Sequence, residues 1–209
     1  MRSESVWSDM VAIQDLVCRE RYWRDRGEWD AMRSAFTDDA RLRVTWFEGS
    51  IDDYVESSRT RDWDPSASST HRLSPSVVTV HGDRALAETP ALVELRIEAA
   101  GMWVDAVISV RLLSRVVRTR QGWKLASMDA IYEKDVIRPV FPADRLAISA
   151  EDTAAYRRSY QFLAYGGNGR LPDDVPGDDR PELVAALYAA ARAWLRPDER
   201  RAAGGPAHG

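Results

Sequence analysis

The stretch RALAETP ALVELRIEAA GMWVDAVISV RLLSRVVRTR QGWKLASMDA IY, residues 84–132, decides the fold of this chain. Between residues 85 and 99, small and apolar side chains occupy the odd positions, while glutamate and arginine occupy several of the even ones. From residue 104 to residue 112 the apolar side chains occupy even positions instead. A period of two is typical of β-strands that bury one face. The pattern therefore predicts two long neighbouring strands, each with one apolar face.

Two short breaks separate these runs from each other and from a third strand. Ala100-Gly101 lies between the first two runs, and Arg120-Gln121-Gly122 precedes the strand that begins at Trp123. Short breaks that contain glycine favour antiparallel hairpins. Strands of this length exceed the usual five or six residues, so we expect the sheet to bend and to hold helices in its concave side.

Before the long strands, the chain alternates between helical and strand patterns. Apolar residues at three- and four-residue spacing predict a helix at Val6–Arg26, which Gly27 ends, and a short helix at Glu28–Phe36. Further along, we expect a strand at 40–47, a helix at 51–60, a loop at 64–68 and a strand at 70–80. This order of elements predicts an α+β fold with the helices segregated to one face of the sheet.

The last third of the chain has a different character. Ser149 and the acid three residues later are a helix-start signal for a helix at 152–165, and Pro181 begins another that extends to Leu195. A connection rich in glycine, proline and aspartate joins the two. We therefore divide the chain into a main domain at 1–148, a helical extension at 149–196 and a tail at 197–209 that we predict to be disordered.

Composition and charge exclude several classes of protein. The formal net charge is -4, and the arginines alternate with acidic residues, so we expect no surface for nucleic acid. The sequence has neither the apolar core of a signal peptide nor a run of about eighteen apolar residues, so we expect a cytoplasmic protein without a membrane span. Cys18 is the single cysteine and the three histidines are scattered, so we expect neither a disulfide nor a metal site.

His71 is the best candidate for a general acid or base. An imidazole with an ordinary pKa near 6.5 takes up and returns a proton at neutral pH, and a nearby carboxylate can fix its tautomer. Asp25 is the candidate carboxylate, because it continues a helical stripe through Cys18 that we predict to be buried. In the alternative reading, His71 bonds to backbone at a strand end, and Asp25 pairs with Arg21 or Arg24 on a solvated helix end.

Four short matches relate the chain to a known family. They are Asp25-Arg26-Gly27-Glu28-Trp29-Asp30, Leu42-Arg43-Val44-Thr45-Trp46, Ser69-Thr70-His71 and Gly122-Trp123-Lys124-Leu125. In this order and spacing, within residues 6–135, they resemble the nuclear transport factor 2-like superfamily, and within it the SnoaL-like and scytalone dehydratase-like group. The resemblance implies a cone-shaped, curved, mixed or antiparallel sheet wrapped around the N-terminal helices, as in a cystatin-like α+β barrel, with an apolar pocket.

The resemblance also implies a site. In scytalone dehydratase-like enzymes, the residues matched by Asp25 and His71 line the pocket and carry out acid/base chemistry without a metal or organic cofactor. Apolar side chains stand here where those enzymes carry polar ones: Leu95 for a second histidine, Val110 and Leu112 for polar residues, and Trp46 for a tyrosine. These departures favour a more apolar substrate. The substrate-binding residues that we predict are Tyr22, Trp46, Leu95, Val110, Leu112 and Tyr132, with plain core packing as the alternative for the aromatic ones.

Two functions of different classes follow. The first is a cofactor-independent lyase, isomerase or cyclase that acts on a hydrophobic small molecule, as in polyketide or aromatic secondary metabolism. The second is a non-catalytic ligand-binding or assembly module of the same fold, such as a small subunit. The distance between Asp25 and His71 separates the two. We also expect a homodimer or homotrimer, formed through the outward face of the sheet at Trp103, Val107 and Leu113.

Overall fold

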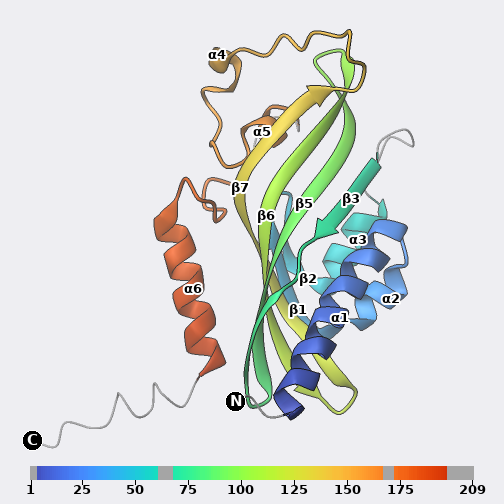
Figure 1. Cartoon of the computed structure of the whole chain (residues 1–209), viewed down its shortest axis with the longest axis vertical. Helices are drawn as coiled ribbons and strands as arrows, with labels where there is room; N and C mark the ends of the chain where they lie inside the picture. Colours follow the sequence, from blue (N-terminus) through green and yellow to red (C-terminus); the bar gives the residue numbers. More distant parts are fainter. Residues whose placement is uncertain (1–3, 61–67, 167–171, 197–209) are drawn as a thin grey trace, which may run out of the picture.

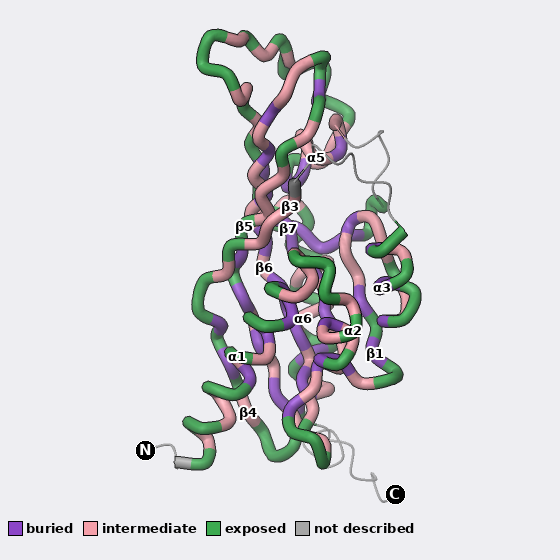
Figure 2. The backbone as a smooth tube through the Cα atoms, turned by 90° about the vertical axis from the view of Figure 1, so that its right-hand side faces the viewer, coloured by how far each residue is buried: buried purple, intermediate pink, exposed green. Residues whose placement is uncertain are grey.

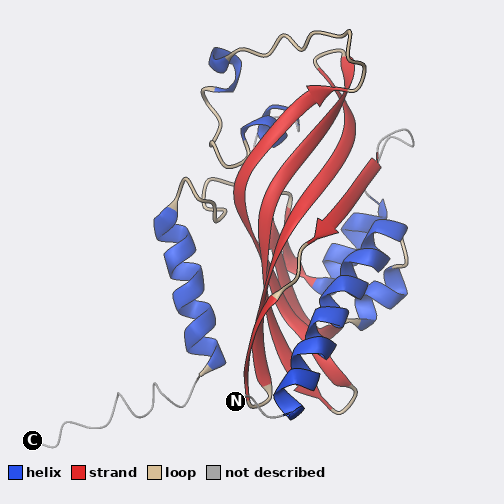
Figure 3. Ribbon diagram, viewed as in Figure 1, coloured by secondary structure: helices blue, strands red, loops and turns tan. Residues whose placement is uncertain are grey.

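The computed structural model describes residues 4–60, 68–166 and 172–196 (Figure 3). Its helices are α1 (Glu4–Arg26), α2 (Trp29–Ser34), α3 (Ile51–Thr60), α4 (Ala150–Thr153), α5 (Gln161–Gly166) and α6 (Pro181–Leu195). Its strands are β1 (Phe36–Val44), β2 (Phe47–Ser50), β3 (Ser68–Leu73), β4 (Val77–His81), β5 (Arg84–Ala99), β6 (Met102–Thr119) and β7 (Gly122–Pro139). The predicted tail, nearly all of the predicted loop at 64–68 and part of the predicted connection before Pro181 lie outside the described residues.

The strands form one curled sheet in the order β2-β1-β7-β6-β5-β3, and β4 pairs with the first part of β5 (Figure 1). The β1–β7 pair is parallel, whereas the other pairs are antiparallel. β2 and β3 lie at the two edges, so the sheet is not closed. The three long strands, the hairpins and the α+β class that the sequence predicts are thereby confirmed.

The turn between β5 and β6 and the irregular pairing of β6 explain how such long strands are accommodated. Ala100 and Gly101 both have positive φ, 51° and 74°, as a two-residue hairpin turn of type I′ requires. The register of β6 against β7 shifts after Ser109 and again after Arg115. Extra residues of this kind bend a strand and increase its twist, which lets the sheet curve around α1, α2 and α3.

The core lies between the inner face of the sheet and α1–α3, and buried backbone follows the long strands through the middle of the molecule (Figure 2). Alternate residues of the two central strands supply its apolar wall, as their period of two predicts. The buried side chains of this wall are Ala85, Ala87, Ala91, Val104, Ala106, Ile108, Val110 and Leu112. The sequence pattern thus identified the inner face correctly.

Several predicted elements differ at their bounds. The predicted strand at 40–47 turns at residues 45–46, where β1 ends and β2 folds back on it. The predicted strand at 70–80 is two strands, because Pro75 interrupts the pairing with β5. The predicted helix at 152–165 is replaced by the short helices α4 and α5, so its apolar residues do not share one helical face.

α1 buries a different face from the predicted one. The predicted buried stripe through Cys18 and Tyr22 faces solvent, with Cys18 exposed and Tyr22 53% exposed. The buried side chains of α1 are Ile13, Val17, Glu20 and Arg21. The prediction was wrong because it followed the less polar residues Cys18 and Tyr22, whereas the charged Glu20 and Arg21 are buried as an ion pair.

α6 covers the outer face of the sheet, opposite α1–α3 (Figure 1). Its Ala191 packs with Leu113 of β6 and Ile131 of β7, and all three are buried. Leu113 is therefore covered by the chain's own helix, and its predicted place on an exposed association surface is wrong. Within the described ranges, no helix combines the length and the apolar character needed to cross a bilayer.

We expect Ile131→Ala to lower the free energy of unfolding by about 2–5 kcal/mol, because Ile131 is fully buried between β7 and α6. Val136, on the same strand but 52% exposed, provides the matched control, and Val136→Ala should change stability by no more than about 0.5 kcal/mol. Urea denaturation measures both. Equal effects of the two changes would contradict the docking of α6 on this face.

Candidate active site

A cavity of about 90 Å³ lies between the C-terminal half of α1 and the inner face of the sheet. Helices, strands and the β1–β2 turn all contribute to it, so residues far apart in the sequence meet there. Its lining consists of Arg21, Arg24, Val44, Thr45, Trp46, Tyr54, Ser69, His71, Val93, Leu95, Ile108, Val110, Leu112, Ala130, Tyr132 and Leu163. Most of these side chains are apolar, and the polar group formed by Arg21, Arg24, Ser69 and His71 comes from α1 and β3.

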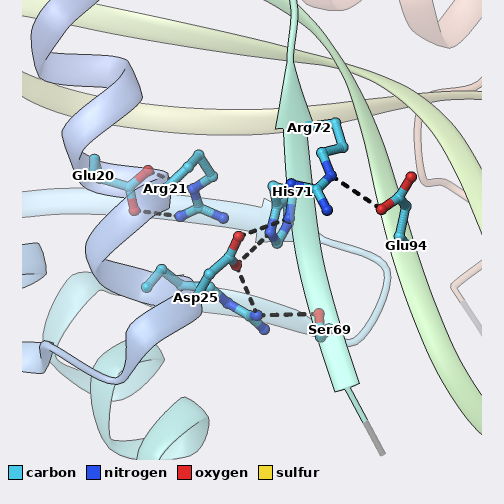
Figure 4. A network of polar contacts seen from close by, with 8 residues as sticks. Glu20, Arg21, Asp25, Ser69, His71, Arg72 and Glu94 are labelled. Carbon is cyan, nitrogen blue, oxygen red and sulfur yellow. Dashed lines mark hydrogen bonds and ion pairs between the residues drawn. The ribbon is translucent and has the colours of Figure 1, made fainter.

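Asp25 holds His71 by two hydrogen bonds. Oδ1 of Asp25 lies 2.7 Å from Nδ1 of His71, and Oδ2 accepts the backbone N–H of the same residue at 2.7 Å (Figure 4). Arg24 supports the pair, since its Nη1 lies 3.5 Å from Oδ1 of Asp25 and donates to Oγ of Ser69 at 3.3 Å. The side chains of Asp25 and His71 are only 8% and 9% exposed. The alternative in which Asp25 lies on a solvated helix end is thereby wrong.

Local structure explains why these two residues meet. α1 ends at Gly27, whose φ of +70° favours glycine, so Asp25 is held in the last turn of the helix. On β3, His71 is opposite Val93 of β5, and directly paired residues share a face, which points the imidazole inward. β3 is an edge strand, and an edge leaves backbone N–H groups without a strand partner. Asp25 accepts one of them.

The electrostatics favour a neutral imidazole beside an ionised carboxylate. Burial lowers the pKa of His71, and the charges of Arg21 and Arg24 lower it further, against the opposing effect of Asp25. Burial alone would raise the pKa of Asp25, but the hydrogen bonds from His71 outweigh it and lower that pKa. With Asp25 ionised, Nδ1 of His71 carries the proton. Nε2 then keeps its lone pair and is able to act as a base.

A buried ion pair on α1 was missed by the sequence reasoning. Arg21 donates through Nε and Nη2 to the Glu20 carboxylate, and both side chains are almost completely buried. Arg21 also lines the cavity, and Figure 4 shows its guanidinium on the side of Glu20 that faces His71. A signal existed in the spacing, because Arg21 lies four residues after Val17 and Glu20 lies seven after Ile13.

Aromatic residues form the wall next to the β1–β2 turn. Trp46 stacks on Tyr54 with their ring centroids 5.2 Å apart. The Tyr132 hydroxyl donates to Oγ1 of Thr45 at 3.1 Å and accepts the Thr45 backbone N–H at 3.2 Å. Burial raises the pKa of Tyr132, so it remains a phenol. Both of its hydrogen bonds fix the turn, so Tyr132 shapes the wall in addition to packing in the core.

The C-terminal extension also reaches the cavity. Leu163 of α5 lines it, and the Leu163 backbone N–H donates to Oδ2 of Asp135 on β7 at 2.7 Å. Asp135 is buried, and burial raises its pKa. Nearby, the Tyr132 backbone N–H donates to Pro176 at 3.0 Å, which ties the segment before α6 to β7. The apolar residues between 152 and 165 indicated that this segment packs against another surface, but they did not identify the cavity as that surface.

Of the predicted binding residues, Trp46, Leu95, Val110, Leu112 and Tyr132 lie around the same cavity as His71. The structure does not test their role in binding, which stays a prediction. Tyr22 is different, because it is not among the lining residues and Arg26 stacks over its ring at 4.0 Å. Its prediction as a pocket residue is wrong. The reason is that the helix turns Arg21 inward and leaves its neighbour Tyr22 outside.

Metal ligands do not gather in this site. In the described part of the chain, no three His, Cys, Asp or Glu side chains come together as a metal centre would require.

Comparison with known proteins places the chain in a family. The SnoaL-like domain matches residues 5–129, more than half of the chain, and the chain belongs to this family. Pea pathogenicity protein 2 from Fusarium vanettenii is 27% identical over 210 residues, which covers 91% of this chain and 89% of that protein. The family match confirms the recognition made from the four sequence motifs.

Solved structures share the fold. A provisionally assigned scytalone dehydratase from Novosphingobium aromaticivorans has a TM-score of 0.54 at 16% identity, over 71% of this chain and 99% of that one. A type 3 hexachlorocyclohexane dehydrochlorinase from Novosphingobium barchaimii has a TM-score of 0.52 at 17% identity, over 68% and 97% of the two chains. At these identities the likeness shows the fold alone, which is the predicted nuclear transport factor 2-like one.

We expect Asp25→Asn to lower the pKa of His71 further, because the carboxylate is what raises it against burial and the two arginines. In the unaltered protein, this pKa should already be below the ordinary 6.5. Titration of the imidazole nitrogens by NMR measures both values, with the exposed His81 as an internal reference signal. A higher pKa for His71 in the variant would contradict the assigned hydrogen bond.

Proposed function

We propose that this chain is a cofactor-independent acid/base enzyme that acts on a hydrophobic small molecule as a lyase, isomerase or cyclase. The observation that carries the proposal is the 2.7 Å hydrogen bond between Asp25 and His71 at the wall of a mainly apolar cavity. A base held by a buried carboxylate is the arrangement that proton transfer requires. The scytalone dehydratase-like group, which the sequence resembles, uses a matching pair.

The proposed chemistry begins with proton removal. Nε2 of His71 takes a proton from an activated carbon of the substrate, and the imidazolium that forms is stabilised by Asp25. In a lyase, the C–H electron pair becomes a double bond while a leaving group departs, and the imidazolium protonates it. In an isomerase, the same proton returns to a different carbon. Each route begins and ends with neutral His71 and needs no oxidant or reductant.

The apolar walls support a substrate with few polar groups. Leu95, Val110 and Leu112 offer no hydrogen bonds, and they exclude water that would compete for the proton. The volume of about 90 Å³ is below the roughly 150 Å³ at which an apolar cavity admits benzene. A ring-sized substrate therefore requires the wall to yield. The wall can move most readily at Leu163, because this residue belongs to the short helix α5.

We expect His71→Ala to lower the rate of proton exchange by about 10²–10⁴-fold, the usual contribution of a general acid or base. The assay follows the replacement of C–H by C–D in D₂O, by NMR, over a panel of small cyclic ketones and their β-hydroxy derivatives. His81→Ala is the matched control, because His81 lies exposed at the end of β4. An unchanged rate in the His71 variant would contradict the assignment of His71 as the general base.

The same assay distinguishes the enzyme from the binding-module alternative. A module binds members of the panel without exchange, whereas an enzyme exchanges the protons of at least one member. The hydrogen bond between Asp25 and His71 favours the enzyme, because a carrier has no need for a base held in a fixed tautomer.

We also expect the rate to fall at acidic pH. Because burial lowers the pKa of His71 from its ordinary 6.5, the base is mainly neutral at pH 7, and kcat/KM should decline on acidification with a midpoint below pH 6.5. A pH–rate profile measures the midpoint. A midpoint above pH 6.5 would show that some other group acts as the base.

A further inference from the structure

Arg21 is a buried cation at the wall of the cavity. Its side chain is only 4% exposed, and Glu20 accepts from its Nε and Nη2. The Tyr54 hydroxyl, which also lines the cavity, interacts with the same guanidinium. In Figure 4, Nη1 lies at the end of the guanidinium farther from Glu20. Glu20 thus holds one edge of the guanidinium, and the other edge lies at the cavity beside Tyr54, where a ligand oxygen can accept from it.

The charges that line the cavity are positive. The guanidinium groups of Arg21 and Arg24 line it beside the neutral imidazole of His71, while no aspartate or glutamate of the described residues does. The carboxylates that balance them, Glu20 and Asp25, lie behind the arginines and the imidazole. Two ion pairs therefore direct their cationic ends at an apolar space. Electrostatic attraction is strong in such a space because little water screens it.

The position of this arginine is costly for folding. Burying an ion pair removes two charges from water, and well-packed apolar residues at such positions are often as stable or more stable. A contribution to the stability of the fold therefore does not account for the buried Glu20–Arg21 ion pair. A guanidinium with two of its three nitrogens held by a buried carboxylate is, in contrast, preorganised to bind a negative oxygen.

We propose that Arg21 binds an oxyanion of the substrate, and that the substrate is a small apolar carbon acid with a carbonyl or phenolic oxygen. This inference rests on the proposed function of His71. When Nε2 takes the proton from the carbon next to the carbonyl, the C–H electron pair forms the new C=C bond. The carbonyl π pair moves to oxygen, and Nη1 of Arg21 stabilises the resulting enolate. The proton resides on His71, and nothing is oxidised or reduced.

The test is a comparison of two probes that differ in charge and little in shape, 4-nitrophenolate and 4-nitrotoluene. Both are titrated into the unaltered protein and into Leu163→Ala, which gives a ring more room. We expect the phenolate to bind about tenfold to a hundredfold more tightly than the neutral probe, as one charge-assisted hydrogen bond provides. Bound 4-nitrophenol should also ionise at a lower pH than the free compound, which its absorbance reports.

The variant that removes the charge is the double change Glu20→Gln with Arg21→Gln. It leaves neither partner buried and unpaired, whereas Arg21→Gln alone would strand the Glu20 carboxylate. We expect the double variant to bind both probes within about twofold of each other, because the donor of the charge-assisted bond is gone. Arg26→Gln is the matched control on the same helix, since Arg26 stacks on Tyr22 outside the cavity, and it should keep the preference.

Three results would overturn the inference. They are equal binding of the two probes by the unaltered protein, a preference that survives in the double variant, and failure of both probes to bind even with Leu163→Ala. Circular dichroism of the double variant identifies loss of fold, and in that case Arg21→Lys, which keeps the charge and loses the planar fork, must weaken the preference. His71→Ala should keep the preference. The two hypotheses can therefore fail separately: an error about His71 changes the exchange assay, and an error about Arg21 changes the preference for the charged probe.

Discussion

The Asp25 carboxylate joins the end of α1 to the edge strand β3, and the rest of the site depends on this junction. One oxygen holds the backbone of His71 and the other holds its ring, so a single side chain fixes strand and imidazole together. Hydrogen bonds to a charged group contribute about 1.5–3 kcal/mol each. The two bonds to Asp25 therefore add to the pairing with β5 that holds the short edge strand β3 in place. The position and the tautomer of the imidazole are therefore set by the same side chain.

The second organising feature is the separation of charge from apolar surface. Leu95, Val110 and Leu112 make the sheet side of the cavity apolar. In these surroundings the electrostatic interactions of the arginines on the α1 side are weakly screened. The same apolar surroundings lower the pKa of His71 and keep it neutral. The apolar wall and the neutral imidazole are consequently linked, because water in a solvated groove would remove the burial that lowers the pKa of His71.

The sequence predicted the sheet well and the helices less well. Alternation placed Leu95 and Val110 inward because a strand has only two faces, so identifying one settles the other. A helix offers a continuum of faces, and following the stripe through Cys18 put Tyr22 in the pocket and left Arg21 outside. The cover of α6 over Leu113 could not be predicted either, since an apolar helix face does not indicate which of several apolar surfaces it covers.

β7 serves two sides of the protein with consecutive residues. Ile131 lies under α6, while Tyr132 faces the cavity and fixes the turn at Thr45. Because the backbone of a strand moves as a unit, a shift that accommodates a new side chain beneath α6 also displaces the cavity wall. The two surfaces are therefore mechanically joined through one peptide bond, and repacking under the outer helix reaches the wall on the other side of the sheet.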